Sequence, residues 1–339
     1  MAGKIKLSNP QISLTIDLNG GCLASFSHIN APDLNVLNFS FTKEQMETLG
    51  NTGAPFKGHF LCCPYWGSAG PSGNDQAPWH GPFAAGKWRK LERKDHSLCI
   101  EAHHQDYGIG IQKKIIIHTS NAIFKVEETI QNLMNNPVPF NLVQHPSLAA
   151  PFLNEHTVLY SNAVRGILQE NIFSAQIKRT TIWPIVKKNK QKINISKSKD
   201  QESIVATFIL PANEKIGWVI THSPVQQLLF GYCWLITDYP WLNIWKHVEQ
   251  DKTIYTGLEF GTTGVHLSLQ ETMLHYTQIW NRKTYELLYP KAKIVKGYWS
   301  FLAPLKGVNN VVKNISYELL KNAIIIQPEM GKKITIPLF

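Results

Sequence analysis

Short segments rich in Ile, Val, Thr and Phe follow one another along the whole chain, and turn residues separate them. Within many of these segments apolar and polar residues alternate, which is typical of strands that bury one face. Examples are IKLSNPQISLTIDL, LCIEAHH, IQKKIIIHT, AIFKVEETIQNL, SIVATFIL, IGWVITHS and LLFGYCWLI. The pattern predicts an all-β chain of about twenty or more strands, which must form two packed sheets or a closed barrel.

No break divides this pattern into separate domains. The sequence has no repeat of fixed period and no linker, and only Thr42 to Leu49 is predicted to be helical, with Thr42 and Gln45 spaced as a capping box. Hydrophobic residues make up 43% of the 339 residues, which is enough for one large core. We therefore expect a single all-β domain spanning residues 1–339, with loops gathered at the sheet ends or over an open concave face.

Composition argues against membrane and nucleic-acid partners. No run of about 18 apolar residues is present, and the start MAGKIKLSNPQISL has no signal-peptide core, so a cytoplasmic protein is expected. The five cysteines lack CxxC spacing and are expected to be reduced and mostly buried. The formal charge is +10, but six lysines lie in residues 187–200, without arginine or aromatic residues. This run indicates a solvated hairpin tip or excursion rather than a nucleic-acid site.

One loop is unusually rigid and aromatic. Residues 60–83, FLCCPYWGSAGPSGNDQAPWHGPF, contain two tryptophans, four prolines and four glycines, with no helix or strand period. Within it, Gly81 permits close approach of a backbone or ligand, Trp79 offers a flat apolar face, and His80 offers a donor or a cation near neutral pH. The ordinary alternative is a loop histidine that is bonded to backbone carbonyls.

Two further segments carry a titratable residue in an apolar setting. NNPVPFNLVQHP predicts a strand that Pro146 stops, so that His145 lies at the strand end. In TDYPWLNIWKHVEQDKTIYTGLEFGTTG, Glu259 occupies an otherwise uncharged strand, where apolar surroundings raise a carboxyl pKa toward the range of a base working near neutrality. The alternatives are a core or turn histidine and a buried glutamate paired with a cation.

In this order, the three segments resemble the aldose 1-epimerase (galactose mutarotase) superfamily. The strongest local similarity is ETIQNLMNNPVPFNLVQHP, and CCPYWGSAGPSG…WHGPFAAGKW is similar to a loop of the hexose-6-phosphate epimerase branch. ISLTIDLNGGCLASFSH is similar to the opening strand pair of that family, and IIIQPEMGKKITIPLF to its closing hairpin. The resemblance implies a β-supersandwich of the galactose mutarotase-like type with a sugar cleft on one concave face.

The resemblance also implies roles for residues of this chain. His145 would be the general acid, Glu259 the general base, and His80 a second histidine that polarises or orients the ring oxygen or the C1 hydroxyl. Side chains expected to contact the sugar are Trp66, Trp79, Gln144, Trp241 and Trp245. Acid–base ring opening needs neither a metal nor a cofactor, and the expected partner is a monosaccharide or short carbohydrate.

Several positions depart from the family pattern. Family members have an arginine before the His-Gly pair, and the phosphate-sugar branch has arginines both before and soon after it, whereas this chain has none near it until Arg89 and offers Lys87 instead. Because guanidinium groups bind phosphate bidentately, a neutral sugar is expected rather than a sugar phosphate. The usual HPYF is replaced by His145-Pro146-Ser147-Leu148, which removes an aromatic wall, and SIVATFIL lacks the aspartate that holds sugar hydroxyls.

Three other functions are compatible with the sequence. A non-catalytic carbohydrate-binding protein of the same fold would keep the aromatic residues while the acid–base pair drifts. A hydrolase or lyase would need a second carboxylate, for which Asp238, Glu249 and Asp251 are the nearest candidates in sequence. A metal site made of His80, His145 and Glu259 is a further alternative, although no HxH or HxxxH pair anchors it.

Overall fold

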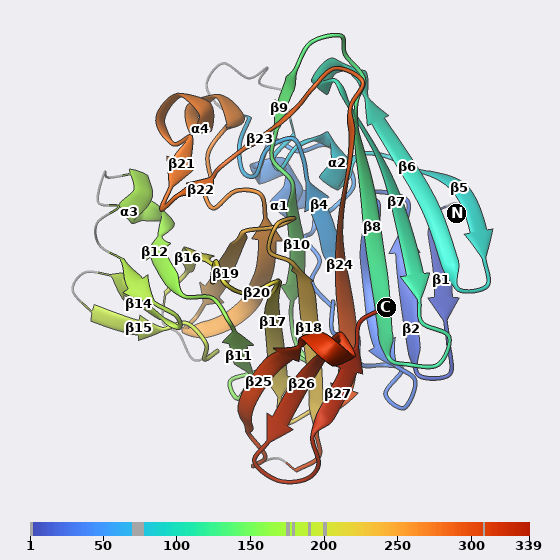
Figure 1. Cartoon of the computed structure of the whole chain (residues 1–339), viewed down its shortest axis with the longest axis vertical. Helices are drawn as coiled ribbons and strands as arrows, with labels where there is room; N and C mark the ends of the chain where they lie inside the picture. Colours follow the sequence, from blue (N-terminus) through green and yellow to red (C-terminus); the bar gives the residue numbers. More distant parts are fainter. Residues whose placement is uncertain are drawn as a thin grey trace.

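The computed structural model describes residues 3–69, 78–173, 177, 180–188, 191–198, 202–307 and 309–339. Two large antiparallel sheets and several small ones account for most of these residues (Figure 1). In β8 (Ile123–Asn132) nearly every second side chain is buried, as alternation in the sequence predicts. The predicted all-β architecture is confirmed.

The larger sheet has ten strands and carries the candidate site. Its order is β1 (Lys4–Ser8), β2 (Ile12–Asp17), β3 (Cys22–His28), β4 (His59–Cys62), β10 (Val143–Leu148), β20 (Lys252–Gly261), β19 (Trp241–Glu249), β16 (Ile204–Ile209), β12 (Arg165–Leu168) and β13 (Thr181–Ile182). The central strands β4, β10 and β20 come from distant parts of the chain, so residues far apart in sequence become neighbours there.

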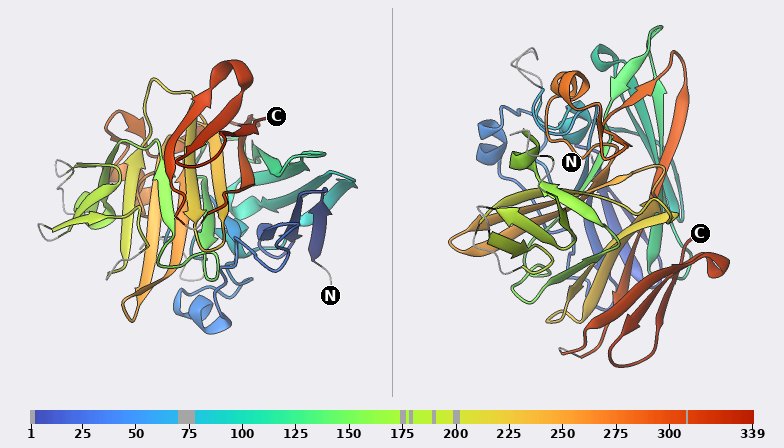
Figure 2. Two further views of the ribbon diagram at one scale, coloured as in Figure 1. Left: turned by 90° about the horizontal axis from the view of Figure 1, so that it is seen from below. Right: turned by 60° about the vertical axis from the view of Figure 1, so that its left-hand side comes forward.

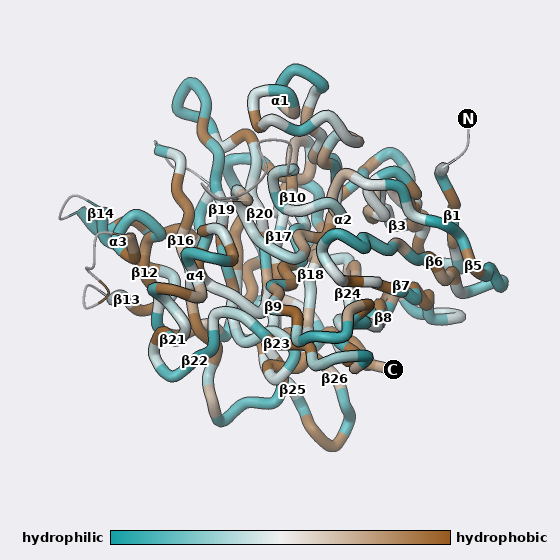
Figure 3. The backbone as a smooth tube through the Cα atoms, turned by 90° about the horizontal axis from the view of Figure 1, so that it is seen from above, coloured by the Kyte–Doolittle hydropathy of each residue, from teal (hydrophilic) through white to brown (hydrophobic). Residues whose placement is uncertain are grey.

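The second large sheet has eight strands. Its order is β11 (Val158–Ser161), β17 (Ile216–Ser223), β18 (Leu228–Leu235), β24 (Lys293–Pro304), β8, β7 (Ile109–Ile117), β6 (Ser97–His104) and β5 (Arg89–Lys94). β5 is fully exposed and hydrophilic (Figure 3), and its charges protect this sheet edge against pairing with another chain.

Small sheets complete the strand content. They are β9 (Val138–Phe140) with β23 (Glu286–Leu288), β14 (Ile185–Lys188) with β15 (Gln191–Asn194), β21 (Gln278–Ile279) with β22 (Arg282–Lys283), and β25 (Val312–Glu318) with β26 (Ala323–Pro328) and β27 (Ile334–Pro337). The β14–β15 pair is the hairpin expected for the lysine-rich run. Residues 189–190 and 199–200 of that run lie outside the described residues.

The two large sheets pack face to face around a shared hydrophobic core. Phe26 of β3 contacts Phe124 of β8 with ring centroids 5.0 Å apart. Trp234 of β18 stacks on Phe260 of β20 at 4.2 Å. Burial of these apolar side chains is the main force that holds the sheets together. That residues 1–339 fold as one domain stays a prediction, which limited proteolysis would test.

The outer faces of the two sheets are covered differently. On the eight-stranded sheet, β25, β26 and β27 form one apolar cluster with residues of β17, β18 and β24, at the bottom of Figure 1 and at the lower right of the second view in Figure 2. β26 and β27 form the expected closing hairpin. On the ten-stranded sheet, side chains from residues 29–58, 63–69 and 78–88 cover Phe60 and Cys62 of β4. The candidate site lies under this second cover.

Helices are few and short. α1 (Lys43–Thr48) follows the N-cap Thr42, and the predicted reciprocal capping box with Gln45 is confirmed. The expectation that only this segment is helical is wrong, because three more short helices form: α2 (Pro82–Ala85), α3 (Gln169–Phe173) and α4 (Leu269–His275). Two 3₁₀ turns, Gln105–Tyr107 and Leu319–Lys321, complete the set among the described residues.

Of the three helices that were not expected, one has a signal in the sequence: Ser268 caps α4 and bonds to Glu271, which is an S-x-x-E pattern. The other two are shorter than two helical turns and show no helical period.

The expected end of a strand at Pro146 is also wrong, because β10 continues to Leu148. β10 pairs with β20 through Val143, Gln144, Ser147 and Leu148, and this pairing skips His145 and Pro146. Proline has no N–H to donate, so it is tolerated where the ladder is interrupted. On its other side, β10 pairs with β4 at both of these residues.

Two expectations from composition concern the whole chain. All five cysteines are free, and all but Cys99 are buried, as predicted. Within the described ranges, no helix combines the length and apolar character needed to cross a membrane.

Candidate functional site

The backbone around His80 is held in an uncommon conformation. His80 has a φ of 65° and Gly81 a φ of 80°. A Cβ atom on Gly81 would lie 2.0 Å from the carbonyl oxygen of Cys63, so only glycine fits there. The His80 N–H donates to the Gly67 carbonyl at 2.7 Å, and the His80 carbonyl accepts from the Cys63 N–H at 3.1 Å. Positive φ at a non-glycine residue is often found at functional sites.

Both ring nitrogens of His80 face N–H donors. Nδ1 lies 3.0 Å from the Gly67 N–H, and Nε2 lies 3.0 Å from the indole N–H of Trp79. A neutral imidazole has only one acceptor nitrogen, so both contacts cannot be hydrogen bonds at once. Because the Gly67 N–H belongs to a fixed backbone, we assign Nδ1 as the acceptor and place the proton on Nε2. The Nε2–H and the Trp79 N–H are then two donors that one oxygen of a ligand would satisfy.

His145 projects from β10 away from the sandwich core. Its ring stacks on Phe60, with centroids 4.3 Å apart, and meets Trp245 edge-on at 5.9 Å. Nδ1 lies 3.0 Å from the hydroxyl oxygen of Ser147. Ser147 is two residues along the same strand and therefore shares the face of His145. These contacts hold the imidazole plane in place.

Glu259 reaches the same place from β20. Its Oε1 lies 3.1 Å from Nε2 of His145. Within the described part of the chain, its Oε2 has no hydrogen-bond partner, and neither has the buried indole N–H of Trp66. That indole lies close enough to lower the pKa of Glu259 in part, although it does not reach hydrogen-bond geometry. Glu259 thus keeps one acceptor atom for a ligand.

Burial shifts the pKa of each titratable group in the direction that favours the neutral form of the group. It raises the pKa of Glu259 well above its ordinary value. It lowers the pKa of His145 to about 3 and that of His266 to about 4, and it lowers the pKa of His80 well below 6.5. The charged form of each group is disfavoured because water is excluded. Such shifts in a cleft are typical of acid–base sites.

These side chains surround a cavity of about 180 Å³, which we name the aromatic pocket. Its described lining is Phe39, Phe41, Leu49, Phe56, Phe60, Trp66, Trp79, His80, His145, Val205, Trp245, Glu259 and His266. The structure therefore brings together six of the eight side chains that the sequence analysis singled out, namely His80, His145, Glu259, Trp66, Trp79 and Trp245.

Gln144 and Trp241, the other two, do not line the aromatic pocket. Gln144 is next to His145 on a strand, so its side chain points to the opposite face, into the core, where it bonds to Glu128 at 2.6 Å. Trp241 is fully buried in a separate cluster, with its indole N–H donating to the Lys283 carbonyl at 2.8 Å. Their expected contact with a sugar is not supported by these positions.

Sequence reasoning missed His266 and Ser147. His266 follows the end of β20, and its ring meets Trp66 edge-on at 4.6 Å and lies 5.9 Å from the ring of His80. No spacing motif links it to the other two histidines. Ser147 could have been found, because i and i+2 on one strand share a face. In the sequence, this position shows only the loss of an aromatic residue.

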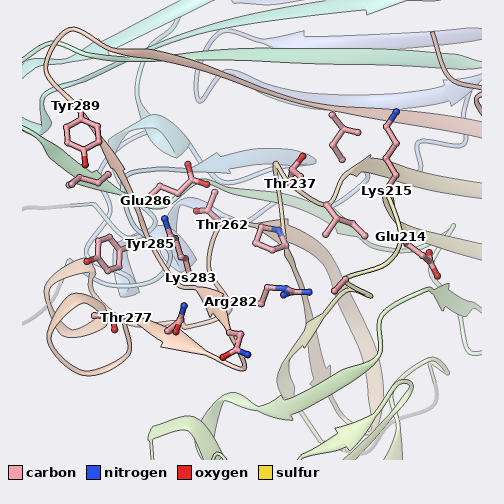
Figure 4. Close-up of a pocket in the computed structure, with 17 residues that line it drawn as sticks. Glu214, Lys215, Thr237, Thr262, Thr277, Arg282, Lys283, Tyr285, Glu286 and Tyr289 are labelled. Atoms are coloured by element: carbon pink, nitrogen blue, oxygen red, sulfur yellow. The ribbon is translucent and has the colours of Figure 1, made fainter.

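A larger groove of about 1180 Å³ lies elsewhere, between β21–β23 and the turns after β16 and β18 (Figure 4). Its two carboxylates are already engaged: Glu286 pairs with Lys296 at 2.8 Å, and Glu214 accepts from Asn162 at 2.6 Å. None of the sequence-predicted residues lines it. Because the described lining of the groove contains neither a histidine nor any of the predicted residues, the aromatic pocket is the candidate site.

A metal site is not supported by the arrangement of side chains. Among residues whose placement is described, no group of three or more His, Cys, Asp or Glu side chains could hold a metal ion. The combination of His80, His145 and Glu259 considered above is therefore not a metal-binding cluster in this structure.

Solved structures share this architecture at low sequence identity. Slr1438 from Synechocystis sp. PCC 6803 matches with a TM-score of 0.64 and 13% identity, over 89% of this chain and 96% of that one. A galactose mutarotase related enzyme from Lactobacillus acidophilus matches with 0.62 and 11%, over 90% and 100%. The GalM/aldose epimerase homologue from C. elegans matches with 0.60 and 11%, over 90% and 100%.

Comparison with protein-family models gives no match, and comparison with curated protein sequences gives no significant match. At such low identities, likeness to solved structures establishes the fold alone. The resemblance drawn from the sequence is confirmed at that level. The chain has the galactose mutarotase-like β-supersandwich fold.

Proposed function

We propose that the protein interconverts the anomers of a cyclic hemiacetal, in the manner of an aldose 1-epimerase, with Glu259 as base and His145 as acid. The observation that carries this proposal is the contact of 3.1 Å between Glu259 Oε1 and His145 Nε2 inside a ring-sized pocket. Both groups are buried, and each has a pKa shifted toward its neutral form. The raised pKa suits Glu259 to act as a base near neutral pH, whereas His145, whose pKa is lowered, acts as the acid by sharing a proton with Glu259.

The reaction needs two proton transfers at one carbon. The Glu259 carboxylate takes the proton of the C1 hydroxyl while the protonated His145 gives its proton to the ring oxygen. The C1–ring oxygen bond then breaks, and C1 becomes an aldehyde carbon. After rotation about the C1–C2 bond, the two groups reverse their roles and the ring closes on the other face of the carbonyl.

The ligand must replace the direct contact between the acid and the base, because Nδ1 of His145 is bonded to Ser147 and Nε2 is the nitrogen that donates to the ring oxygen. In a hemiacetal, the ring oxygen and the hydroxyl oxygen are bonded to the same carbon, so the two proton-transfer groups can act from adjacent positions. The free Oε2 of Glu259 is available to the hydroxyl. We propose that His80, through its Nε2–H, orients one of the two oxygens of the ligand, because this proton has no acceptor in the assignment above.

The pair is expected to work with one shared proton. Two arrangements contain the same number of protons: Glu259 protonated beside neutral His145, and Glu259 ionised beside protonated His145. They differ by one proton transfer across the 3.1 Å contact. Burial favours the neutral arrangement at rest. A polar ligand that accepts from the imidazole and donates to the carboxylate favours the ionised one. The pKa values that a titration measures therefore belong to the pair rather than to either residue.

A neutral ligand is favoured over a phosphorylated one. Among the described residues that line the aromatic pocket, none is lysine or arginine. A phosphate group would enter apolar surroundings without a cationic partner, which is strongly unfavourable. Calorimetric titration of a hexose and its 6-phosphate at physiological salt tests this point, and we expect the neutral sugar to bind more tightly.

Polarimetry on freshly dissolved aldose anomers tests the proposed activity. Wild-type protein should accelerate the approach to anomeric equilibrium, and Glu259→Gln should not, although both should show the same circular dichroism spectrum and thermal unfolding. Equal acceleration by the two proteins would contradict the assignment of the base. The Thr221→Val variant, changed at a buried position of β17 outside the pocket, is a matched control.

A non-catalytic carbohydrate-binding function is the second candidate, and one observation favours it. His145 and Glu259 bond to each other, whereas an acid and a base that act on a ligand are normally separated by a gap that holds it. In a binding protein, ligand affinity would be measurable while wild type and Glu259→Gln both leave anomer exchange at its spontaneous rate. A glycosidase is disfavoured, because Glu259 is the single carboxylate among the described lining residues.

A further inference from the structure

The described lining of the aromatic pocket is far less polar than a site for a fully hydroxylated sugar requires. Of its thirteen described lining side chains, nine are aromatic or aliphatic, and the other four are three histidines and Glu259. The described lining contains no Asp, Asn, Gln, Ser, Thr, Lys or Arg, the residues that hold most sugar hydroxyls in proteins. The pocket has the features of a hydrophobic ligand site with a few well-placed polar groups.

Those polar groups gather at one end of the pocket. The rings of His80 and His145 lie 5.3 Å apart, His80 and His266 lie 5.9 Å apart, and His145 contacts Glu259. The unpartnered indole N–H of Trp66 belongs to the same end, since its ring meets His266. Together these groups can satisfy the ring oxygen and the C1 hydroxyl of a hemiacetal.

The rest of the described lining is a hydrocarbon wall. Phe39 packs against Phe41 with ring centroids 5.0 Å apart and against Trp245 at 5.9 Å, and Phe41 lies 6.3 Å from Phe56. Leu49 and Val205 complete this wall. A hydroxyl directed at it would lose its bonds to water without gaining a partner. A methyl or methylene group in the same place would gain favourable burial.

Size limits the ligand as well. At about 180 Å³, the cavity lies below the range of roughly 300–1,000 Å³ that is common for drug-sized ligands. A single six-membered ring with small substituents is the largest unit expected to be fully enclosed.

We infer that the ligand of the aromatic pocket is a single-ring hemiacetal with few hydroxyl groups, a deoxy or alkylated pyranose rather than a fully hydroxylated hexose. The hemiacetal part rests on the proposed function, whereas the apolar part rests on the composition of the wall. Each hydroxyl removed from the edge that meets the wall should increase kcat/KM about fivefold to tenfold, the usual effect of relieving one unsatisfied buried polar group.

The test compares a hexose with its 4-deoxy and 3,4-dideoxy forms, because C3 and C4 lie on the ring edge opposite the ring oxygen and C1. Catalysed anomer exchange is measured by NMR for each sugar, corrected for its spontaneous rate. Binding of the matching 1,5-anhydro compounds, which lack a C1 hydroxyl and cannot react, is measured by calorimetry. We expect kcat/KM and affinity both to rise as hydroxyls are removed. A hexose that binds and reacts at least as well as its dideoxy form would overturn the inference.

The two arms separate this inference from the proposed function. If the deoxygenated anhydro compounds bind more tightly but no sugar is anomerised, the ligand class stands and the proposed activity fails. If anomerisation is catalysed with preference for the hexose, the activity stands and the ligand class fails. Absence of binding by every compound would overturn the inference.

A single isosteric change sharpens the test. Val205→Thr adds a hydroxyl to the hydrocarbon wall without changing its shape, so the preference for the dideoxy sugar should shrink severalfold. Val295→Thr makes the same change at an exposed position of β24 and is the matched control. An unchanged preference in a folded Val205→Thr variant would contradict the assignment of this wall as the edge that selects the ligand.

Discussion

The polar side chains on the two faces of β10 have different surroundings. On the core side, Gln144 donates to Glu128 at 2.6 Å and bonds to His59 at 3.0 Å, and His59 bonds to Tyr232 at 2.9 Å. Lys113 lies 3.2 Å from the second oxygen of Glu128. We name Lys113, Glu128, Gln144, His59 and Tyr232 the Gln144 network. On the other side, His145 and Glu259 face a cavity, and Glu259 keeps an oxygen without a partner among the described residues.

Both groups are buried, so burial alone does not identify the functional one. The Gln144 network connects two sheets, and its polar groups bond to one another as in a structural cluster. Glu128 Oε1 has no hydrogen-bond partner within the described chain, but it is paired with the Lys113 cation. The aromatic pocket leaves Glu259 Oε2, the Trp66 N–H and one donor of His80 available beside a cavity. Unused polar capacity next to a cavity is what distinguishes a candidate site from a core cluster.

The largest effect should come from breaking the acid–base pair. Glu259→Gln keeps the shape of the side chain but removes the base, so anomer exchange should fall about 10²- to 10⁴-fold. Ligand affinity should change far less, because the amide oxygen of glutamine can still accept from the C1 hydroxyl. Polarimetry and calorimetry measure the two quantities. The losses in Glu259→Gln and His145→Ala should not add in the double variant, since the two groups act as a unit.

The next effect is on stability and belongs to the other face. Lys113→Met leaves the Glu128 carboxylate buried without its cation, so the free energy of unfolding should fall by about 3–5 kcal/mol. Urea unfolding measures this change. The double variant Lys113→Met/Glu128→Gln should recover most of the loss. Activity per folded molecule should stay near wild type, and a loss of activity as large as that of Glu259→Gln would erase the distinction between the two faces.

Period-two alternation was enough to predict the sandwich, because a strand that buries one face shows it in sequence. It also placed His145 and Glu259 on strands, but their contact depends on which strands become neighbours. β10 and β20 are paired although about a hundred residues of sequence separate them. The same alternation would have excluded Gln144, which follows Val143 and precedes His145. Trp241 and Trp245 share a face, and only the covering helices and loops decide that Trp241 is sealed off.

Acid should weaken the fold through histidines on both faces. The pKa of His145 is lowered to about 3 and that of His266 to about 4, and those of His59 and His80 are well below 6.5. Below pH 6.5 the unfolded chain therefore binds more protons than the folded one, and stability falls by up to about 1.4 kcal/mol per pH unit for each histidine. Urea unfolding between pH 7 and pH 5.5 measures this slope.

Glu259 should act in the opposite direction. Its folded pKa is raised, so the folded state binds the proton first, and its contribution to stability grows as pH falls through that pKa toward 4.5. Glu259→Gln removes this offset, and the loss of stability on acidification should become steeper. His145→Gln removes one of the destabilising titrations and should make it shallower. Equal slopes in the three proteins would show that the pair titrates alike in the folded and unfolded chains.

The smallest expected effect concerns Ser147, which is bonded to Nδ1 of His145 at 3.0 Å. Its hydroxyl can donate to or accept from this nitrogen, so it can follow either protonation state of the ring. Ser147→Ala should lower the free energy of unfolding by about 1 kcal/mol and slow anomer exchange only severalfold, because the ring remains stacked on Phe60. The pH dependence of the exchange rate should shift, which a purely structural role would not produce.

Thr221→Val removes a buried hydroxyl that has no partner within the described chain, on the eight-stranded sheet, and should leave both rate and pH profile unchanged. If the two variants behave alike, Ser147 belongs with the structural residues and the pocket side of β10 contains one positioning group fewer.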